Sequence, residues 1–166
     1  GRTIAEARER SRPAEKIGYR HSYDMLGEAA RTTQDALRYF ESYTRAIDAL
    51  ALEVADHSPI TAPSISVKLS ALHPRYEVSQ RDRVFTELVP AIKKLAMQAK
   101  RAGIGFTIDA EEMDRLELSL DLIEQLALDP DLAGWNGFGM AVQAYAKRAL
   151  PVIEWLADLA RRADRR

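Results

Sequence analysis

Four short stretches of the chain alternate apolar and polar side chains, the period of a β-strand with one buried face. The clearest are residues 65–70 and 104–110, where every second side chain is Ile, Val, Leu or Phe. Residues 137–145 follow the same alternation, and residues 19–25 follow it weakly. The sequence therefore predicts four strands at these positions.

Between and after the strands, apolar residues recur at spacings of three and four, which predicts helices with one buried face. The four stripes are Ala36, Phe40, Tyr43, Ile47, Leu50 and Val54; Val84, Leu88, Ile92, Leu95 and Ala99; Leu116, Leu120, Ile123 and Leu126; and Val152, Trp155, Leu156 and Leu159. Gly103 is placed to end the second of these helices. Strands that alternate with helices imply parallel pairing, so the predicted class is α/β, either a (β/α)8-type barrel or an open doubly wound sheet.

Composition narrows the class of protein without naming a function. The 166 residues are 46% hydrophobic and 30% charged, which suits one globular domain, and the net charge of -1 gives no reason to expect nucleic acid as a partner. The absence of cysteine excludes disulfides and thiolate chemistry and is consistent with a cytoplasmic protein. No apolar run is long enough to cross a membrane, and the chain begins without methionine, as a portion of a longer protein would.

Polar side chains stand near the C-terminal end of each predicted strand: Asp24, Lys68, Asp109 and Gln143. In parallel α/β folds these strand ends share one rim, and the active site lies there. We therefore expect the four residues, distant in sequence, to converge on one site.

Lys68 is the sharpest of these candidates, because a lysine buried without a partner costs several kcal/mol. It should meet a carboxylate from Asp109, Asp24 or Glu28, or an anionic ligand. Alternatively, Lys68 forms an internal ion pair that only helps to close the barrel. Asp109 could likewise serve only as the partner of Lys68 in that ion pair.

Gln143 lies on the same side of its predicted strand as Gly139 and Ala141. Those small residues leave space for a flat ligand, although a packed core glutamine is the alternative. No metal site is expected. Glu111 and Glu112 are expected to open the following helix, where the helix dipole favours them, and His21, His57 and His73 lack metal-ligand spacing.

Four segments resemble the strand motifs of proline dehydrogenase domains in the bifunctional proline utilization A family. They read YDMLGEAA at 23–30, SVKLSALHPRY at 66–76, IDAEE at 108–112 followed by DRLELSLD at 114–121, and VQAY at 142–145 followed by KR at 147–148. The second is the most specific. They occur in the order and spacing of the family over essentially the whole chain.

The resemblance implies a distorted (β/α)8 barrel that binds FAD and oxidises L-proline to Δ1-pyrroline-5-carboxylate by hydride transfer to flavin N5. It implies that Lys68 pairs with the proline carboxylate, that Asp109 organises the charged groups of the same site, and that Gln143 hydrogen-bonds the flavin ring. Residues 1–166 correspond to the N-terminal half of that barrel, so strands five to eight, which carry further substrate and FAD contacts, are expected from a missing second half. A cytoplasmic protein, peripheral at the inner membrane, that passes electrons to a membrane quinone is the further expectation.

Two other functions remain open from the residues alone. A Schiff-base aldolase could use Lys68 as its nucleophile, since lysines on barrel strands attack carbonyls. A non-catalytic half-barrel could serve only in assembly. A half-barrel would leave the edges of its first and fourth strands unpaired and would uncover an apolar face.

Overall fold

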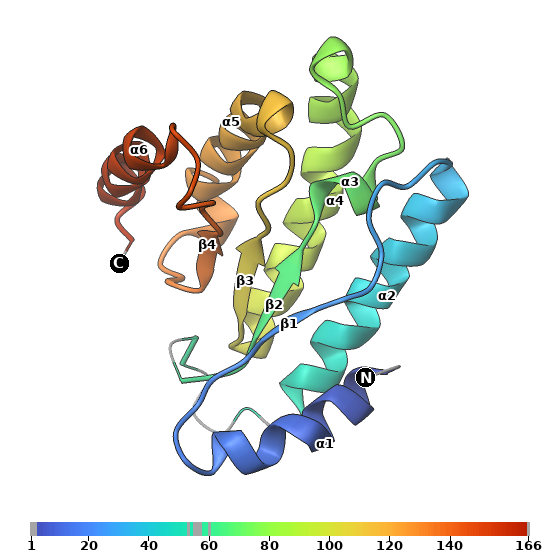
Figure 1. The fold of residues 1–166 in the computed structure, drawn as a ribbon, viewed down its shortest axis with the longest axis vertical. Coiled ribbons are helices and arrows are strands. Elements are labelled where there is room, and N and C mark those ends of the chain that lie inside the picture. Colours follow the sequence, from blue (N-terminus) through green and yellow to red (C-terminus); the bar gives the residue numbers. More distant parts are fainter. Residues whose placement is uncertain (1–2, 53, 55–57, 60, 166) are drawn as a thin grey trace.

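The strands form one parallel sheet at the centre of the fold (Figure 1). The computed structural model describes residues 3–52, 54, 58–59 and 61–165. The strands are β1 (Ser22–Asp24), β2 (Ser64–Val67), β3 (Gly105–Ile108) and β4 (Phe138–Met140), paired in the order β1-β2-β3-β4. All three strand pairs are parallel, so the predicted α/β class with four strand–helix units is confirmed.

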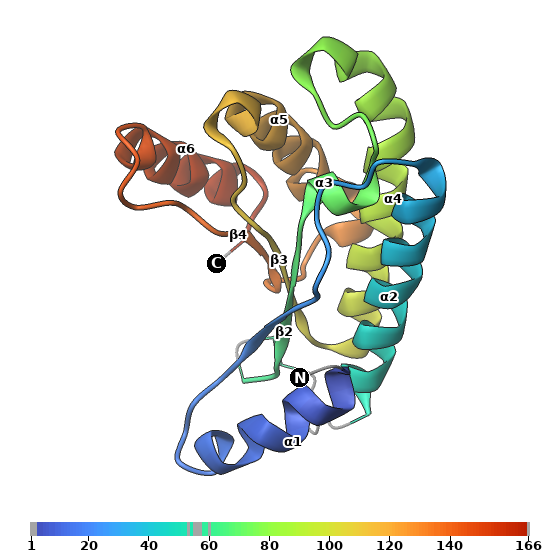
Figure 2. The same cartoon turned by 45° about the vertical axis from the view of Figure 1, so that its right-hand side comes forward.

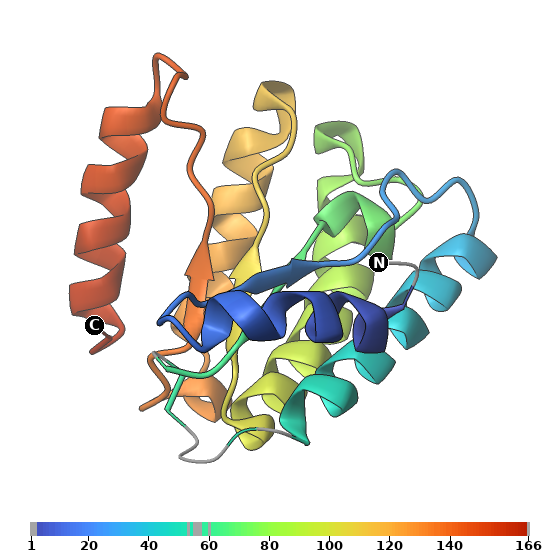
Figure 3. The same ribbon diagram turned by 60° about the horizontal axis from the view of Figure 1, so that its bottom comes forward.

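Helices follow each strand and cover one face of the sheet. The helices are α1 (Ile4–Glu15), α2 (Thr33–Ala51), α3 (Leu69–Leu72), α4 (Arg81–Ala102), α5 (Leu116–Ala127) and α6 (Ala149–Arg162), with short 3-10 turns at Val78–Gln80, Met113–Arg115 and Pro130–Leu132. Helices α2, α4, α5 and α6 stand side by side in an arc behind the strands (Figure 3). Helix α1 lies across the end of the sheet where the strands begin (Figure 2).

Local sequence signals account for where the long helices begin and end. Thr32 and Asp35 form a reciprocal capping box at the start of α2, which satisfies backbone N–H groups that have no partner within the helix. Gly103 ends α4 with φ of 70°, a left-handed conformation that glycine adopts without strain, as its position in the sequence predicted.

The two faces of the sheet differ in character. Tyr23, Ile65 and Phe106 pair across neighbouring strands and are buried against the helices. One position further along, Asp24, Ser66, Thr107 and Gly139 form a second row that points the other way, and none of these four is buried. The face of the sheet that no described residue covers therefore carries polar and small side chains. The expectation of an uncovered apolar face was wrong for the sheet.

Several predicted boundaries differ from the observed ones. The second strand ends at Val67, so Ser70 belongs to α3 rather than to the strand. The fourth ends at Met140, and Gln143 lies in the loop that follows. In α5 the buried side chains include Leu118 and Leu122, whereas Leu116 and Leu120 of the predicted stripe are only half-buried. None of the described helices combines the length and the apolar character needed to cross a lipid bilayer.

Candidate functional site

Lys68 stands at the C-terminal end of β2, two positions beyond Ser66 and therefore on the polar face of the sheet. Its backbone N–H donates to the hydroxyl of Tyr43 on α2 at 3.2 Å. Its Nζ atom lies 2.6 Å from Oδ2 of Asp24 and 2.9 Å from Oδ2 of Asp109. One amine thus joins the ends of three adjacent strands.

The two carboxylates keep Lys68 charged although its side chain is only 15% exposed. Burial works to lower the pKa of Lys68, but the hydrogen bonds to Asp109 and Asp24 and their negative charges outweigh it and hold that pKa above its ordinary value. The ion pair therefore presents a fixed ammonium group at the rim.

Asp109 is positioned by its own backbone. Its N–H donates to the carbonyl of Val67 at 2.9 Å, which extends the pairing of β2 and β3 by one step past the regular strands. Its Oδ1 accepts the N–H of Ala110 at 3.0 Å, which leaves Oδ2 for Lys68. The carboxylate is consequently oriented before any ligand arrives.

Gln143 comes close to this ion pair through a shared hollow rather than a direct contact. Lys68, Gln143, Glu28 and Tyr145 line an open hollow of about 430 Å³, together with Ala29, Ser70 and residues 110–113. Of the sequence-predicted residues, Lys68 contacts both Asp24 and Asp109, and Gln143 faces the same space from the loop after β4. Their convergence on one rim is thus observed, whereas their roles stay predictions.

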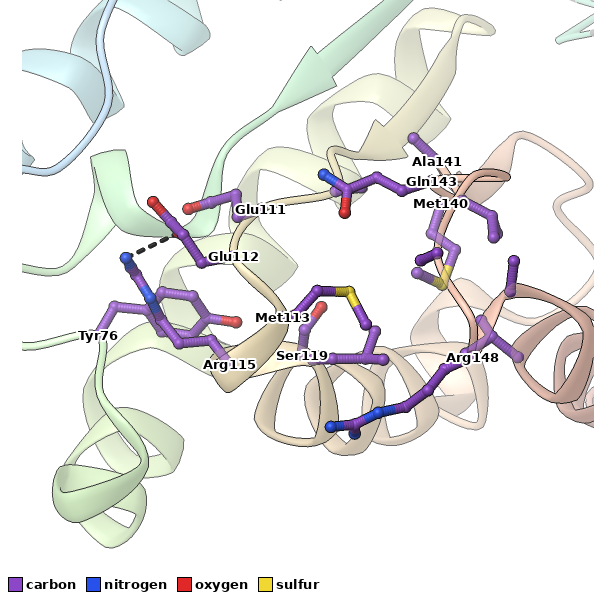
Figure 4. A pocket seen from close by; sticks show the side chains of 16 residues that line it. Tyr76, Glu111, Glu112, Met113, Arg115, Ser119, Met140, Ala141, Gln143 and Arg148 are labelled. Atoms are coloured by element: carbon purple, nitrogen blue, oxygen red, sulfur yellow. Dashed lines mark ion pairs between the residues drawn. The ribbon is translucent and has the colours of Figure 1, made fainter.

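A narrower pocket of about 30 Å³ lies beside the hollow, between the loop that follows β3 and the loop that follows β4. Tyr76, Met113, Met140 and Gln143 are among its lining residues (Figure 4). The amide end of Gln143 points across this space towards the loop that carries Glu111 (Figure 4). The pocket has room for little more than a water molecule, so the open hollow is the candidate binding site.

The two glutamates after β3, both expected to open the next helix, make different contacts. Glu111 does not open α5: its carboxylate accepts the backbone N–H of Ser70, with distances of 3.0 and 3.3 Å to its two oxygens. Glu112 precedes the 3-10 turn and pairs with Arg115 at 2.7 Å. The short helix α3 was missed because its first two residues, Leu69 and Ser70, continue the alternation of the strand. No signal in the sequence gave the Glu111–Ser70 contact, which depends on the loop conformation.

The two described histidines have structural partners. Nδ1 of His21 lies 3.6 Å from Oε1 of Glu15. His73 is buried, accepts the N–H of Arg75 at Nδ1 (3.1 Å) and contacts Glu87 through Nε2 (3.2 Å). His57 lies outside the described residues. Within the part of the chain that the structure describes, no group of three His, Asp or Glu side chains is arranged to hold a metal ion.

Comparison with known proteins places these observations in a family. The family model of proline dehydrogenase matches residues 7–166. The chain is 54% identical over its whole length to the bifunctional protein PutA of Escherichia coli (strain K12) and 54% identical to that of Rhizobium meliloti, and it spans 13% of each.

Solved structures agree with this assignment. The fold matches all of the chain to a proline utilization A variant from Bradyrhizobium japonicum with a TM-score of 0.87, 52% identity and 17% of that chain covered. A proline utilization A from Bdellovibrio bacteriovorus, 21% identical over 98% of the chain, shares the fold with a TM-score of 0.89. The four strand–helix units thus match part of the proline dehydrogenase barrel of these proteins, and the chain belongs to the proline dehydrogenase family.

Proposed function

We propose that residues 1–166 form the N-terminal half of a proline dehydrogenase barrel that oxidises L-proline to Δ1-pyrroline-5-carboxylate with FAD. The observation that carries this proposal is the ammonium group of Lys68, which two aspartates hold charged at the rim of the sheet. A similar solved structure, of proline utilization A, has proline bound in remote sites, and its name is consistent with a proline-recognising protein.

In this proposal Lys68 binds the proline carboxylate. A charged amine at the edge of an open hollow is the complement of a small carboxylate, and such a contact is strong when it is partly shielded from water. Asp109 keeps the amine protonated and oriented, so the substrate meets a group that needs no rearrangement. The substrate carboxylate and the reacting ring carbon are thereby held in a defined place.

The residues present fit the ring of FAD but not its phosphates. The amide of Gln143 can donate and accept at the edge of a flavin ring, and a Cβ built on Gly139 would meet no atom within 4 Å, which leaves space for a flat group against the end of β4. The hollow is otherwise acidic: Glu28, Glu111 and Glu112 line it, and Lys68 is the single cation among its lining residues. The diphosphate therefore requires basic groups from the second half of the barrel.

FAD, when bound, supplies the hydride acceptor at N5. The residues of this chain orient the substrate and cofactor and fix the charge around the substrate carboxylate. In the intact protein we propose that electrons then pass to a membrane quinone from a cytoplasmic protein peripheral at the inner membrane. L-proline and the missing second half of the barrel are the partners that this half requires.

The aldolase alternative is disfavoured by the state of Lys68. A Schiff-base lysine reacts as the neutral amine, usually in a site that lowers its pKa. Here Asp24 and Asp109 raise the pKa of Lys68 and keep it protonated. The charged state of Lys68 does not argue against a non-catalytic half-barrel. Measuring the flavin content of the intact protein distinguishes that alternative from the enzyme.

The proposal is tested on the intact parent protein. The purified protein should carry flavin absorbance and should reduce an artificial dye when L-proline is added. Borohydride treatment in the presence of a carbonyl substrate should leave Lys68 unmodified. A parent protein without flavin and without proline-dependent dye reduction would overturn the proposed activity.

A further inference from the structure

Ser70 connects three loops at the rim of the sheet. It is only 5% exposed and uses its N–H, its hydroxyl and its carbonyl in separate hydrogen bonds. Its Oγ accepts the N–H of Ala29 at 3.1 Å, and its carbonyl accepts the N–H of Ala30 at 2.8 Å. These two bonds tie the loop after β1 to the start of α3, and the N–H of Ser70 remains for the loop after β3.

Glu111 takes that remaining N–H. The carboxylate reaches Ser70 with distances of 3.0 and 3.3 Å from the nitrogen to its two oxygens. Helix α3 has four residues, and Lys68 at its N-cap provides no side-chain hydrogen bond. Glu111 therefore does from the loop after β3 what a capping residue next to the helix would do, and its charge makes this a strong hydrogen bond.

The spacing of this contact is matched to the ion pair. Ser70 lies two residues beyond Lys68, and Glu111 lies two residues beyond Asp109. The bond from the Asp109 N–H to the Val67 carbonyl, at 2.9 Å, holds β3 to β2 on the strand side of the ion pair. The Glu111–Ser70 bond holds the loop after β3 to α3 on the side of the ion pair that faces away from the strands. Lys68 and Asp109 are thus braced from both sides.

We propose that Glu111 is a positioning residue of the proline dehydrogenase site, one that acts through the Ser70 N–H to fix the Lys68 ammonium relative to Asp109. The proposal rests on the proposed function, because it assumes that Lys68 binds the substrate carboxylate. Without Glu111 the loop after β3 loses this tie to α3, and Lys68 and Asp109 no longer keep the 2.9 Å separation between Nζ and Oδ2. Substrate binding weakens, whereas the hydride-transfer step, which the flavin supplies, is little changed.

The experiment compares three variants of the intact flavin-containing enzyme by steady-state kinetics with proline. Glu111→Ala removes the acceptor and should raise KM roughly tenfold, the effect of losing one charge-assisted hydrogen bond, with kcat within about twofold of wild type. Glu111→Gln keeps an amide oxygen that can accept the Ser70 N–H without the charge, so its KM should lie between those of wild type and Glu111→Ala. Asp129→Ala is the matched control, because it also removes a carboxylate that accepts a backbone N–H, but in the segment between α5 and β4, at the end of the sheet where the strands begin. It should lower the unfolding temperature without raising KM.

Each result decides the inference. A normal KM in Glu111→Ala overturns it. A KM in Glu111→Gln as high as in Glu111→Ala also overturns it, because the hydrogen bond to the Ser70 N–H would then contribute nothing to substrate binding. An equal rise in Asp129→Ala also overturns it, because the effect of Glu111→Ala would then be general destabilisation.

A crystal structure of Glu111→Ala separates this inference from the proposed function. An unchanged Lys68–Asp109 separation overturns the positioning role even if the wild-type protein fails to oxidise proline. That failure would overturn the proposed function, while a widened ion pair in the variant would still support Glu111 as its brace.

Discussion

The Nζ atom of Lys68 lies 2.6 Å from Oδ2 of Asp24, the last residue of the edge strand β1. Asp24 is the more exposed of the two carboxylates that Lys68 contacts, with 51% of its side chain accessible against 27% for Asp109. A ligand carboxylate that approaches Lys68 from the open side therefore competes first with Asp24. Asp109, which is oriented by the N–H of Ala110, can stay in place.

Replacing Asp24 with asparagine is expected to strengthen proline binding. Asp24→Asn removes the exposed competitor while Asp109 still neutralises Lys68. Exposed ion pairs contribute about 0.2–1 kcal/mol, so KM for proline should fall by roughly 1.4- to 5-fold. Steady-state kinetics on the intact enzyme give the answer. A raised KM would mean that Asp24 supports the charged state of Lys68 rather than competing with the substrate.

Replacing Lys68 with methionine is expected to act on the substrate more than on the cofactor. Lys68→Met deletes the proposed carboxylate contact and leaves Asp24 and Asp109 facing each other without a cation between them. The loss should amount to roughly 2 to 4 kcal/mol of substrate binding, seen as a large rise in KM. Flavin content, measured by absorbance of the purified protein, should change far less. Kinetics identical to wild type would remove Lys68 from the site.

Replacing Gln143 with alanine is expected to act on the flavin more than on substrate binding. Gln143→Ala removes an amide proposed to hydrogen-bond the flavin ring, so the flavin spectrum or its reduction potential should shift. Binding of a carboxylate inhibitor, which depends on Lys68, should remain close to wild type. Spectral titration and potentiometry on the intact enzyme measure both. An unaltered spectrum and potential would show that Gln143 serves only to pack the loop after β4.

The sequence predicted the parallel strands and the shared rim for a physical reason. In Ile65–Val67 and Phe106–Ile108 the alternation decides which side chains face the helices, and parallel pairing then brings the next polar residues, Lys68 and Asp109, to one end. The contact between Glu111 and Ser70 could not be predicted this way, because it joins a loop to the four-residue helix α3, and neither segment has a periodic pattern. Gln143 was placed on the right rim but on a strand, since the alternation continues past Met140 where the pairing stops.

Alkaline pH is expected to destabilise the fold through Tyr43. Its side chain is 1% exposed, and this burial is the main cause that raises its pKa from 10.0 to about 12. The hydrogen bond from the Lys68 N–H acts to lower the pKa, whereas the negative charges of Asp24 and Glu111 act to raise it further. The folded state thus keeps a proton that the unfolded chain releases, so stability falls as pH rises from 10.0 to about 12. The slope from this one group is about 1.4 kcal/mol per pH unit.

The Tyr43→Phe variant isolates that slope. It should be less stable than wild type at neutral pH, because the Lys68 N–H loses its acceptor. Above pH 10.0, however, its stability should decline less steeply. Denaturant unfolding of the two proteins at a series of alkaline pH values measures the difference. Parallel stability curves would show that Tyr43 ionises as readily in the folded state as in the unfolded chain.

Expressed alone, these 166 residues are expected to self-associate and to lack both FAD and proline oxidation. Among the described strands, β1 and β4 each pair on one side only, and unpaired edges recruit other strands. Large apolar side chains such as Leu26 at 90% and Leu150 at 65% exposure add to this tendency. The polar inner face of the sheet opposes it, so ordered association through the edges, including closure of a full barrel by two copies, competes with aggregation.

Solution mass, flavin absorbance and proline-dependent dye reduction of the purified chain distinguish the outcomes. A monomer with bound flavin and turnover would mean that strands five to eight contribute far less to the site than its acidic lining indicates.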